Sequence, residues 1–584
     1  MKKKLVCVMS FALLAVALAV FRVTAASGVD YAYSVKGGEV TDADGFVEAL
    51  TDANGNAHAE KVDENTIRIK NNLLLSAPIN ISAGSYTLLG NGSTLYRGFS
   101  NEPMIVLDGS EGSGGPSLTL ETDIGDEEWD EQNFRLCIDG NSENYPDSEY
   151  GLIFVKGNVR LTVNGRVILK NSSTVTAGGG IYAEMNISEG VEKSPLSPTV
   201  TVSNARIINC SAKSVGGGIA FVGYSKGMNS GTLKVTNTVM TGDKSHNEKK
   251  TGTGGAIYTY GGEVEISNMT FSENSADNGG ALYIASECKL STLTFERNEA
   301  LVDGGALYGA ADNHIRCDIV LEDVAMTENK SGGDGGAVYN QGIMTSNNLM
   351  VSQNDSDGNG AGIYNSGFTE LNEGSVMNNE SLISGGGIYS SGKDSVTVLK
   401  SPSISSNKAK YCASVYSEGT LEFYSGTIEN GNGEFPSVLI KGEITLYGKV
   451  SVVKDVIGLC VTEENGEKNY PYIKLEPSSG FYNEVTAAFC SEKTDKDGNV
   501  SGYRNVSKSK MLVVFGDEAS MLETLENLSV KSRGLLSYKI QKTGFLSVRF
   551  VYLPVFVWVI IIVAAAVTVS LIFRKKIVAL IKKK

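Results

Sequence analysis

A five-residue phrase returns through the middle of the chain and constrains the fold more than any other feature. It consists of two small residues, a small or aliphatic residue, an aliphatic residue and a tyrosine, as in Gly-Gly-Ala-Ile-Tyr at Gly254–Tyr258. Complete copies end at Tyr258, Tyr283, Tyr308, Tyr339, Tyr364 and Tyr389. Earlier copies end at Tyr182 and Ala220, and a degenerate copy ends at Tyr416. Subtracting successive tyrosine numbers from Tyr258 to Tyr416 gives steps of 25, 25, 31, 25, 25 and 27. Such a period predicts a solenoid, because each repeat buries its apolar face only against its neighbours.

A second phrase, Phe-x-x-Asn, alternates with the first. It occurs at Phe271–Asn274 and Phe295–Asn298, and the matching asparagines later in the chain are Asn329, Asn354, Asn379 and Asn407. The step from asparagine to the next tyrosine is 9 or 10 residues, whereas the step from tyrosine to asparagine varies from 15 to 21. The extra residues therefore enter one arc of each coil, which we predict carries the loops.

These alternating phrases resemble the paired repeats of the chlamydial polymorphic outer-membrane proteins. The resemblance covers roughly Gly178 to Tyr416. It implies a right-handed parallel β-helix, similar to the solenoid of pectate lyases, that is displayed on a cell surface and acts as an adhesin. The chain departs from that family at its C-terminal end, where a single apolar segment is followed by lysines. The mode of export and the type of membrane therefore do not carry over.

Each position of the repeat has an expected role. The aliphatic residues should point inward and stack at the strand spacing of ~4.8 Å, and they are Ile257, Leu282, Leu307, Val338, Ile363 and Ile388. The alternation of a strand then places the tyrosines outside. We expect the asparagines to form an internal ladder at a turn, with amides hydrogen-bonded along the column. Asn365, just after a tyrosine, is expected on the loop side and less constrained.

The composition excludes several classes of protein. With 41% hydrophobic residues, 20% charged residues and only 11 prolines among 584 residues, the chain can fill a core. A formal net charge of -15 with few basic clusters argues against nucleic acid as a partner. Seven cysteines remain after Cys7 leaves with the predicted signal peptide, and their irregular spacing indicates buried thiols, not a disulfide framework.

The chain divides into an all-β solenoid with flanking segments. An amphipathic stretch over 42–54, with Phe46, Val47 and Leu50 on one side, predicts a helix that caps the first coil. Asp495–Asn499 predicts a hairpin turn. The expected parts are a signal peptide (1–26), an N-terminal capping segment (27–60), a single-stranded right-handed parallel β-helix (61–455), a small β-rich C-terminal module (456–548), a transmembrane helix (551–573) and a basic cytoplasmic tail (574–584).

The apolar segment Val551–Phe573 is long enough to span a bilayer, for which about 20 residues suffice. Arg574, Lys575 and Lys576 follow it, so the tail is expected inside and the repeats outside a cell membrane that the chain crosses once. A sortase-type sorting signal is the alternative. It requires Leu-Pro-x-Thr-Gly, whereas Leu553-Pro554 is followed by Val-Phe-Val.

Catalytic and metal-binding patterns are weak. The three histidines, His58, His246 and His314, are far apart, and Arg68-Ile69-Lys70 resembles a polygalacturonase phrase without the paired aspartates that the chemistry requires. Asp355–Asn359 resembles the first half of a calcium loop but lacks the closing glutamate. We therefore expect no catalytic residue, no metal and no cofactor, with a structural calcium ion as the alternative.

The functional prediction is a membrane-anchored extracellular adhesin or binding scaffold. Its partner would be a cell-surface glycan or protein, and nucleic acid is not expected. The alternative is a polysaccharide lyase or glycoside hydrolase built on the same β-helix. The candidate ligand-binding residues are the outward tyrosines Tyr258, Tyr283, Tyr308, Tyr339, Tyr364 and Tyr389.

Overall fold

In the computed structural model of the chain, nearly all regular secondary structure of the described residues is β-strand, and the chain divides into two compact units, Met1–Ile319 and Val320–Lys584. The structure describes residues 32–109, 115–121, 133–186, 196–225, 228–429, 435–448, 450–453, 457–464, 467–469, 471, 473–475, 485–496, 500–505, 513–515, 528–533, 536–540 and 546–550. The predicted signal peptide, the apolar segment 551–573 and the basic tail lie outside these residues. Within the described part, no helix is both long and apolar enough to cross a membrane.

The first unit begins with a short helix, α2 (Ala43–Ala49), which lies within the predicted stretch 42–54. Its first turn is fixed by Asp42, whose carboxylate accepts a hydrogen bond from the Gly45 amide at 2.7 Å. Phe46 and Ala49 are buried beneath it. After the helix, β3 (Ala59–Lys61) pairs antiparallel with β4 (Thr66–Ile69), whereas the coils that follow pair in parallel.

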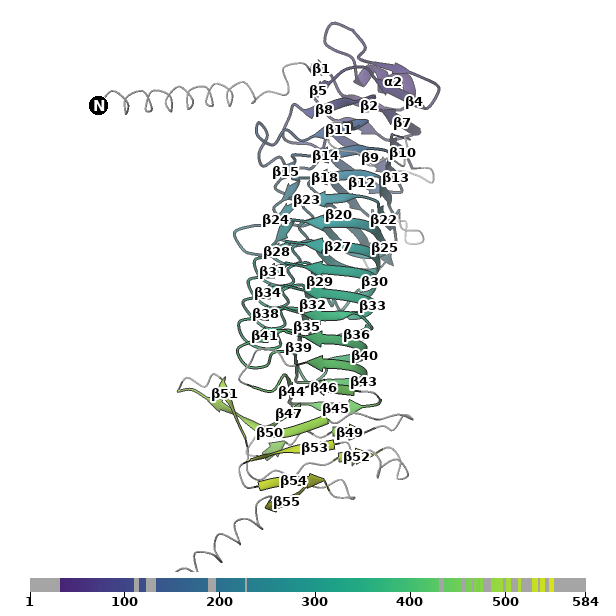
Figure 1. The fold of residues 1–584 in the computed structure, drawn as a ribbon. Helices are drawn as coiled ribbons and strands as arrows, with labels where there is room; N and C mark the ends of the chain where they lie inside the picture. Colours follow the sequence, from purple (N-terminus) through teal and green to yellow (C-terminus); the bar gives the residue numbers. More distant parts are fainter. Residues whose placement is uncertain are drawn as a thin grey trace, which may run out of the picture. The chain divides into compact units, whose positions relative to one another are not determined.

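The coils of unit 1 stack as columns of parallel strands, one above another (Figure 1). The first column holds β2 (Gly38–Val40), β6 (Ile79–Ile81), β9 (Ile105–Gly109), β12 (Ile153–Gly157), β16 (Ile181–Glu184), β20 (Ile219–Ser225) and β29 (Leu307–Gly309). The second holds β4, β7 (Ser85–Leu89), β10 (Ser117–Leu120), β13 (Arg160–Val163), β17 (Thr199–Ser203) and β22 (Thr232–Thr236). The third holds β1 (Tyr33–Val35), β5 (Leu73–Leu75), β8 (Ser93–Arg97), β11 (Leu136–Asp139), β14 (Val167–Lys170), β18 (Ala205–Ile208) and β23 (Val239–Thr241). In β25 (Ile257–Ser272) and β27 (Leu282–Glu296) all three runs of a coil are continuous.

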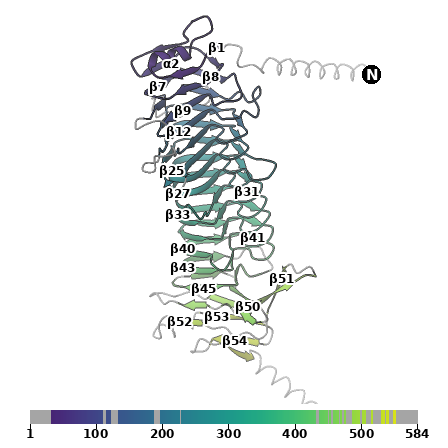
Figure 2. The same ribbon diagram turned by 180° about the vertical axis from the view of Figure 1, so that it is seen from behind.

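A fourth column of two-residue strands follows the asparagine turns. In unit 1 it contains β15 (Ser173–Thr174), β19 (Ser211–Ala212), β24 (Lys244–Ser245), β26 (Ser275–Ala276) and β28 (Glu299–Ala300). In unit 2 it contains β31 (Lys330–Ser331), β34 (Asp355–Ser356), β38 (Glu380–Ser381) and β41 (Lys408–Ala409). Figure 1 shows strands of this column, such as β24 and β34, at the edge where loops project, and Figure 2 shows β31 and β41 of unit 2 from behind.

Unit 2 continues the same order of strands. Its first column contains β32 (Val338–Asn340), β35 (Ile363–Asn365), β39 (Ile388–Ser390), β42 (Val415–Ser417), β44 (Val438–Ile440), β47 (Ile457–Glu464), β50 (Val485–Thr494) and β53 (Leu528–Arg533). The other runs of its coils include β33 (Ile343–Ser352), β36 (Phe368–Asn372), β37 (Ser375–Met377), β40 (Val396–Ser405), β43 (Thr420–Glu429), β45 (Glu443–Leu446), β46 (Val450–Val453), β49 (Ile473–Leu475) and β52 (Val513–Phe515). Parallel pairing thus runs through the boundary predicted at 456, from β44 to β47 and from β45 to β49.

Antiparallel strands occur among the last strands of unit 2. The hairpin predicted at Asp495–Asn499 is confirmed, because β50 pairs antiparallel with β51 (Val500–Asn505). The strands β54 (Leu536–Ile540) and β55 (Leu546–Phe550) also pair antiparallel, and β54 pairs in the same way with β53.

The core is formed by like residues stacked in register, such as Ile257 on Leu282 and Ile363 on Ile388. All six aliphatic positions of the repeat are fully buried, and the tyrosine that follows each of them is half-buried on the other side of the strand. Seven cysteines of the described part are buried thiols, Cys137, Cys210, Cys288, Cys317, Cys412, Cys460 and Cys490.

The predicted asparagine ladder is confirmed. In unit 2 the Asn354 amide nitrogen donates to the Asn379 Oδ1 atom at 2.9 Å, and Asn379 donates to Asn407 at 3.0 Å. In unit 1 Asn274 donates to Asn298 at 3.1 Å. Each side chain also accepts from the backbone amide of the asparagine one coil earlier, so the ladder satisfies buried backbone groups as well as side chains.

The expectation that Asn365 is less constrained is wrong. Asn365 is fully buried, and its amide donates to the Val396 carbonyl at 2.9 Å and to the Thr397 hydroxyl at 3.1 Å. The amide of Asn340, one coil earlier, donates to Asn365 at 3.2 Å. A second, shorter ladder therefore lies at the turn that follows the tyrosines.

Asp243 occupies a ladder position as a carboxylic acid. It is fully buried, its Oδ1 atom accepts from the Cys210 amide at 2.8 Å, and its own amide donates to Asn274 at 3.0 Å. Its Oδ2 atom has no hydrogen-bond partner. Burial raises the pKa of this carboxyl well above its usual value, although the Cys210 amide acts in the opposite direction. In the folded protein the Asp243 carboxyl therefore keeps its proton to a higher pH than it does in the unfolded chain.

We expect Asp243→Asn to stabilise the protein at pH 7, because an amide at this position removes the free-energy cost of keeping the buried carboxyl protonated. A raised pKa in the folded state gives stability that is complete below the unfolded pKa and declines as the pH rises, so the gain should vanish near pH 4. Chemical unfolding at both pH values measures this difference. The matched control is Asn298→Asp, which should destabilise more at pH 7 than at pH 4. A gain from Asp243→Asn that is equal at both pH values would contradict the protonated acid.

Candidate ligand-binding site

The repeat tyrosines form a stacked column in each unit. In unit 1 the ring centroids of Tyr258 and Tyr283 are 5.4 Å apart, and those of Tyr283 and Tyr308 are 5.0 Å apart. In unit 2 the separations along Tyr339, Tyr364, Tyr389 and Tyr416 are 4.6, 5.4 and 4.5 Å, with interplanar angles of 9° or less. The ring faces therefore contact one another, so the outer surface of each column consists of ring edges and hydroxyls.

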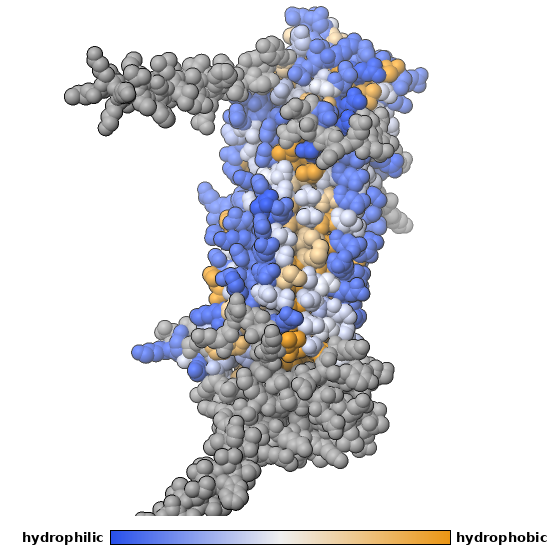
Figure 3. All heavy atoms as spheres, in the orientation of Figure 1, coloured by the Kyte–Doolittle hydropathy of each residue, from blue (hydrophilic) through white to orange (hydrophobic). Residues whose placement is uncertain are grey.

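These hydroxyls are neutral hydrogen-bonding groups at physiological pH. Burial raises the pKa of Tyr283 to about 12 and raises the pKa of Tyr258 and Tyr389 as well. The face drawn in Figure 3 carries pale and apolar residues between strongly polar flanks. Such a face suits a ligand that is itself uncharged and partly apolar.

A cavity of about 450 Å³ lies at the end of the tyrosine column of unit 2, and we name it the end cavity. The column contributes Tyr389 and the fully buried Tyr416. The other lining residues are Asn359, Leu382, Ile383, Ser384, Lys410, Tyr411, Glu418, Lys441, Glu492 and Tyr503. Its volume lies within the range of ~300–1,000 Å³ that is usual for small-molecule sites.

Glu418 is the hydrogen-bonding centre of this region. Its Oε1 atom accepts from Tyr416 at 3.3 Å, from Tyr389 at 3.5 Å and from the Lys441 ammonium at 3.4 Å. Its Oε2 atom accepts from the Gly392 amide at 3.0 Å. The carboxylate thereby ties the last two tyrosines of the column to the next coil.

Lys441 is held as a charged group. Its ammonium lies 2.6 Å from Glu492 Oε1 and 5.4 Å from the centroid of the Tyr416 ring. Burial alone would lower the pKa of Lys441, but Glu492 and Glu418 outweigh it and raise the pKa above its usual value. This ammonium is therefore unsuited to act as a general base near neutral pH.

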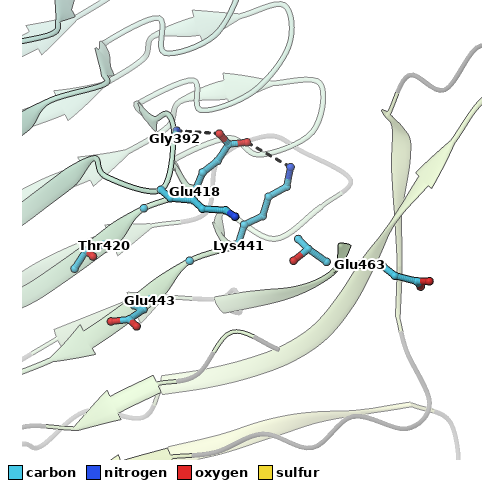
Figure 4. A pocket seen from close by; sticks show the side chains of 10 residues that line it. Gly392, Glu418, Thr420, Lys441, Glu443 and Glu463 are labelled. Atoms are coloured by element: carbon cyan, nitrogen blue, oxygen red, sulfur yellow. Dashed lines mark hydrogen bonds and ion pairs between the residues drawn. The ribbon is translucent and has the colours of Figure 1, made fainter. Parts of the chain in front are cut away.

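Glu418 and Lys441 also line a second, larger hollow of about 670 Å³, which we name the groove (Figure 4). Its other lining residues are Gly392, Lys393, Gly419, Thr420, Gly442, Glu443, Thr462 and Glu463. The glycines are required here, because a Cβ atom on Gly442 would lie 2.1 Å from the Gly419 carbonyl oxygen. The groove gathers carboxylates and lysines, which is the feature that the enzymatic alternative requires.

The other residues singled out from the sequence line neither hollow. His58 contacts Asp52 at 3.3 Å, His246 contacts Asp277 at 3.1 Å, and His314 stacks on Tyr224. Arg68 and Lys70 both pair with Glu60 at 3.2 Å.

The half calcium loop does not form a metal site among the described residues. Asp355 and Ser356 form β34, and the amide of Asn359 donates to Asp334 at 2.6 Å. No three acidic, histidine or cysteine side chains of the described part are arranged to hold a metal ion.

The sequence did not reveal the end cavity, because its residues come from successive coils and from the β50–β51 hairpin. One signal was present. The copy that ends at Tyr416 has lost its glycines and reads Tyr411-Cys412-Ala413-Ser414-Val415-Tyr416. A motif that degenerates in one coil indicates a position where contacts other than regular coil stacking determine the residues.

Comparison with known proteins identifies the repeat. The model of the Chlamydia polymorphic membrane protein repeat matches residues 268–285, which include Phe271–Asn274 and Gly279–Tyr283 and so one alternation of the two phrases. No curated protein and no solved structure gives a significant match to the chain. The chain thus carries a repeat of this family on the coils of a parallel-stranded β-solenoid, and the resemblance stated from the sequence is confirmed.

Proposed function

We propose that this protein is a surface-displayed β-helix that binds ligands on other cells or surfaces, as an adhesin or binding scaffold, without altering them. The observation that carries the proposal is the tyrosine column of unit 2, which is held in register by the coils and ends at the end cavity. The chlamydial type of repeat supports display at a cell surface. Several equivalent coils offer several contacts to one partner, which favours binding through avidity.

The charged groups support binding more than catalysis. A lyase needs a free base, but Lys441 is paired with two carboxylates and Glu418 accepts four hydrogen bonds. The second candidate function is a polysaccharide lyase or glycoside hydrolase that acts in the groove. One specific observation favours it, namely that Glu418, Glu443 and Glu463 line one hollow together with Lys393 and Lys441.

The proposed placement in the cell follows from the ends of the chain. The signal peptide exports the protein, the segment 551–573 anchors it in a membrane, and the tail 574–584 stays in the cytoplasm. The coils then face the outside, where a partner would be a surface glycan or a surface protein.

The test uses the segment Ser27–Phe550, which keeps β55 whole, with plant and bacterial polysaccharides, with intact cells, and with or without calcium. We expect binding to at least one cell surface, and no release of unsaturated or reducing sugar ends. The groove variant Glu443→Gln should leave binding unchanged. Release of new sugar ends that Glu443→Gln abolishes would favour the enzyme, and failure to bind any surface would leave a structural role only.

A further inference from the structure

We propose that the end cavity binds one or two units of an uncharged saccharide, which names the ligand class of the binding function proposed above and rests on it. The two walls of the cavity come from different parts of unit 2. One is the end of the tyrosine column, and the other is the β50–β51 hairpin.

The hairpin places an aromatic and an acidic group side by side. Glu492 and Tyr503 are directly opposed partners in β50 and β51, so their side chains lie on the same face of the hairpin. Tyr503 packs edge-on against Tyr411, with ring centroids 6.3 Å apart, and against Phe435 at 5.7 Å. The hairpin is thereby fixed against the coil, and the cavity has a preformed wall.

The charges that line this cavity favour an uncharged ligand. Its two lysines and two glutamates balance, and Lys441 lies between Glu418 and Glu492. The second ammonium, that of Lys410, lies 4.7 Å from the centroid of the Tyr411 ring. An ionic ligand that binds at Lys441 would have to separate this partly buried ammonium from its two carboxylates, which costs the free energy of both ion pairs.

Polarity excludes purely apolar ligands. Tyr389, Tyr416, Lys441, Glu418 and Glu492 line the cavity, and an apolar ligand would remove water from their polar groups without replacing its hydrogen bonds. Burial raises the pKa of Tyr416 and Tyr503, so both hydroxyls stay protonated. The Tyr416 hydroxyl donates to Glu418, which leaves its oxygen able to accept a hydrogen bond from a ligand.

The rim adds an apolar contact. Leu382 and Ile383 line the cavity and are 59% and 43% exposed. A ligand that fits this combination has hydroxyls on its edges, an apolar C–H face and no charge. An uncharged pyranose has all three properties, and the volume of the cavity accommodates one or two such rings.

The experiment measures binding of the full-length protein in detergent by calorimetry, with neutral gluco-, galacto-, manno- and xylo-oligosaccharides. Oligogalacturonides serve as the acidic probe and an uncharged heptapeptide as the protein-like probe. We expect at least one neutral saccharide to bind. The variant Tyr503→Ala should weaken it about tenfold or more, since aromatic contacts in buried sites carry much of the binding energy.

Two further variants keep the result independent of folding. Leu382→Gln changes an exposed rim residue, so it should leave the melting temperature unchanged and weaken saccharide binding about threefold or more. The matched control Leu301→Gln changes a residue that is 45% exposed in unit 1, and it should change neither property.

The outcomes separate this proposal from the binding function itself. If the protein binds oligogalacturonides or the peptide but none of the neutral saccharides, the proposal of an uncharged saccharide ligand is overturned. The same conclusion would follow if cells bind but no saccharide does, or if Leu382→Gln has no effect, and in those cases the adhesin function would stand. Absence of cell binding together with saccharide binding would overturn the adhesin function and retain a saccharide-binding cavity.

Discussion

Removal of one whole period, Ala281 through Gly305, should leave unit 1 folded. The deletion joins Gly280 to Ala306, which restores the Gly-Gly-Ala-Leu-Tyr phrase and returns every inward residue to the core. Removal of 12 residues, Ala281 through Thr292, should instead unfold several coils, because it places the third run of a coil against the first and destroys the register of like residues.

Circular-dichroism melts of the two variants provide the measurement. We expect the 25-residue deletion to keep a cooperative transition within a few degrees of the parent protein, and the 12-residue deletion to lose much of the β-signal. Similar melts for both variants would contradict a solenoid in which each coil depends on its neighbours.

The second large effect is expected at the asparagine ladder. Asn354→Leu should lower the free energy of unfolding by at least about 1–3 kcal/mol, because the amides of Asn329 and Asn379 lose partners inside a packed turn. Asn365→Leu should now cost a similar amount, since Asn365 is also fully buried and hydrogen-bonded.

The matched control for both substitutions is Asn347→Leu, which changes an exposed asparagine of β33 and should alter stability by less than about 0.5 kcal/mol. Urea unfolding compares the three variants. Equal stabilities for Asn354→Leu and Asn347→Leu would show that the ladder contributes nothing beyond local strand structure.

The sequence predicted the parts of the fold that repeat. Residues such as Ile363, Tyr364 and Asn354 recur at fixed steps, and a fixed step in a solenoid translates directly into a stacked position. The inward orientation of the second ladder was not predicted from the sequence. This ladder has only two asparagines, Asn340 and Asn365, and Ser390 takes the next place, so the repetition is too short to stand out.

The turns contain left-handed backbone conformations that the residue types at those positions do not predict. The residue before each ladder asparagine has a left-handed backbone, with φ of 57° at Glu273, 54° at Arg297 and 58° at Gln353. Glycine or asparagine is the usual choice for such a conformation. The stacking of the coils therefore imposes the left-handed conformation, and local residue preferences do not predict it.

The end cavity could not be predicted for a different reason. Its residues are separated by up to 144 positions, from Asn359 to Tyr503, and the hairpin wall follows no period. Only the placement of β51 beside the last tyrosines brings Tyr503 to Tyr411. The period of the repeat therefore does not predict a site that is formed where the repeat is interrupted.

The antiparallel strands where the coils begin and where they finish have a consequence for self-association. An open parallel coil exposes backbone donors and acceptors that could accept a coil from another copy, and such growth has no natural limit. In unit 1 the helix α2 and the β3–β4 pair occupy the first coil, and in unit 2 β54 and β55 reverse direction after β53. A further parallel coil finds no matching register on a reversed strand. These strands thus act against the growth of fibrils from the first coil of unit 1 and from the last coil of unit 2.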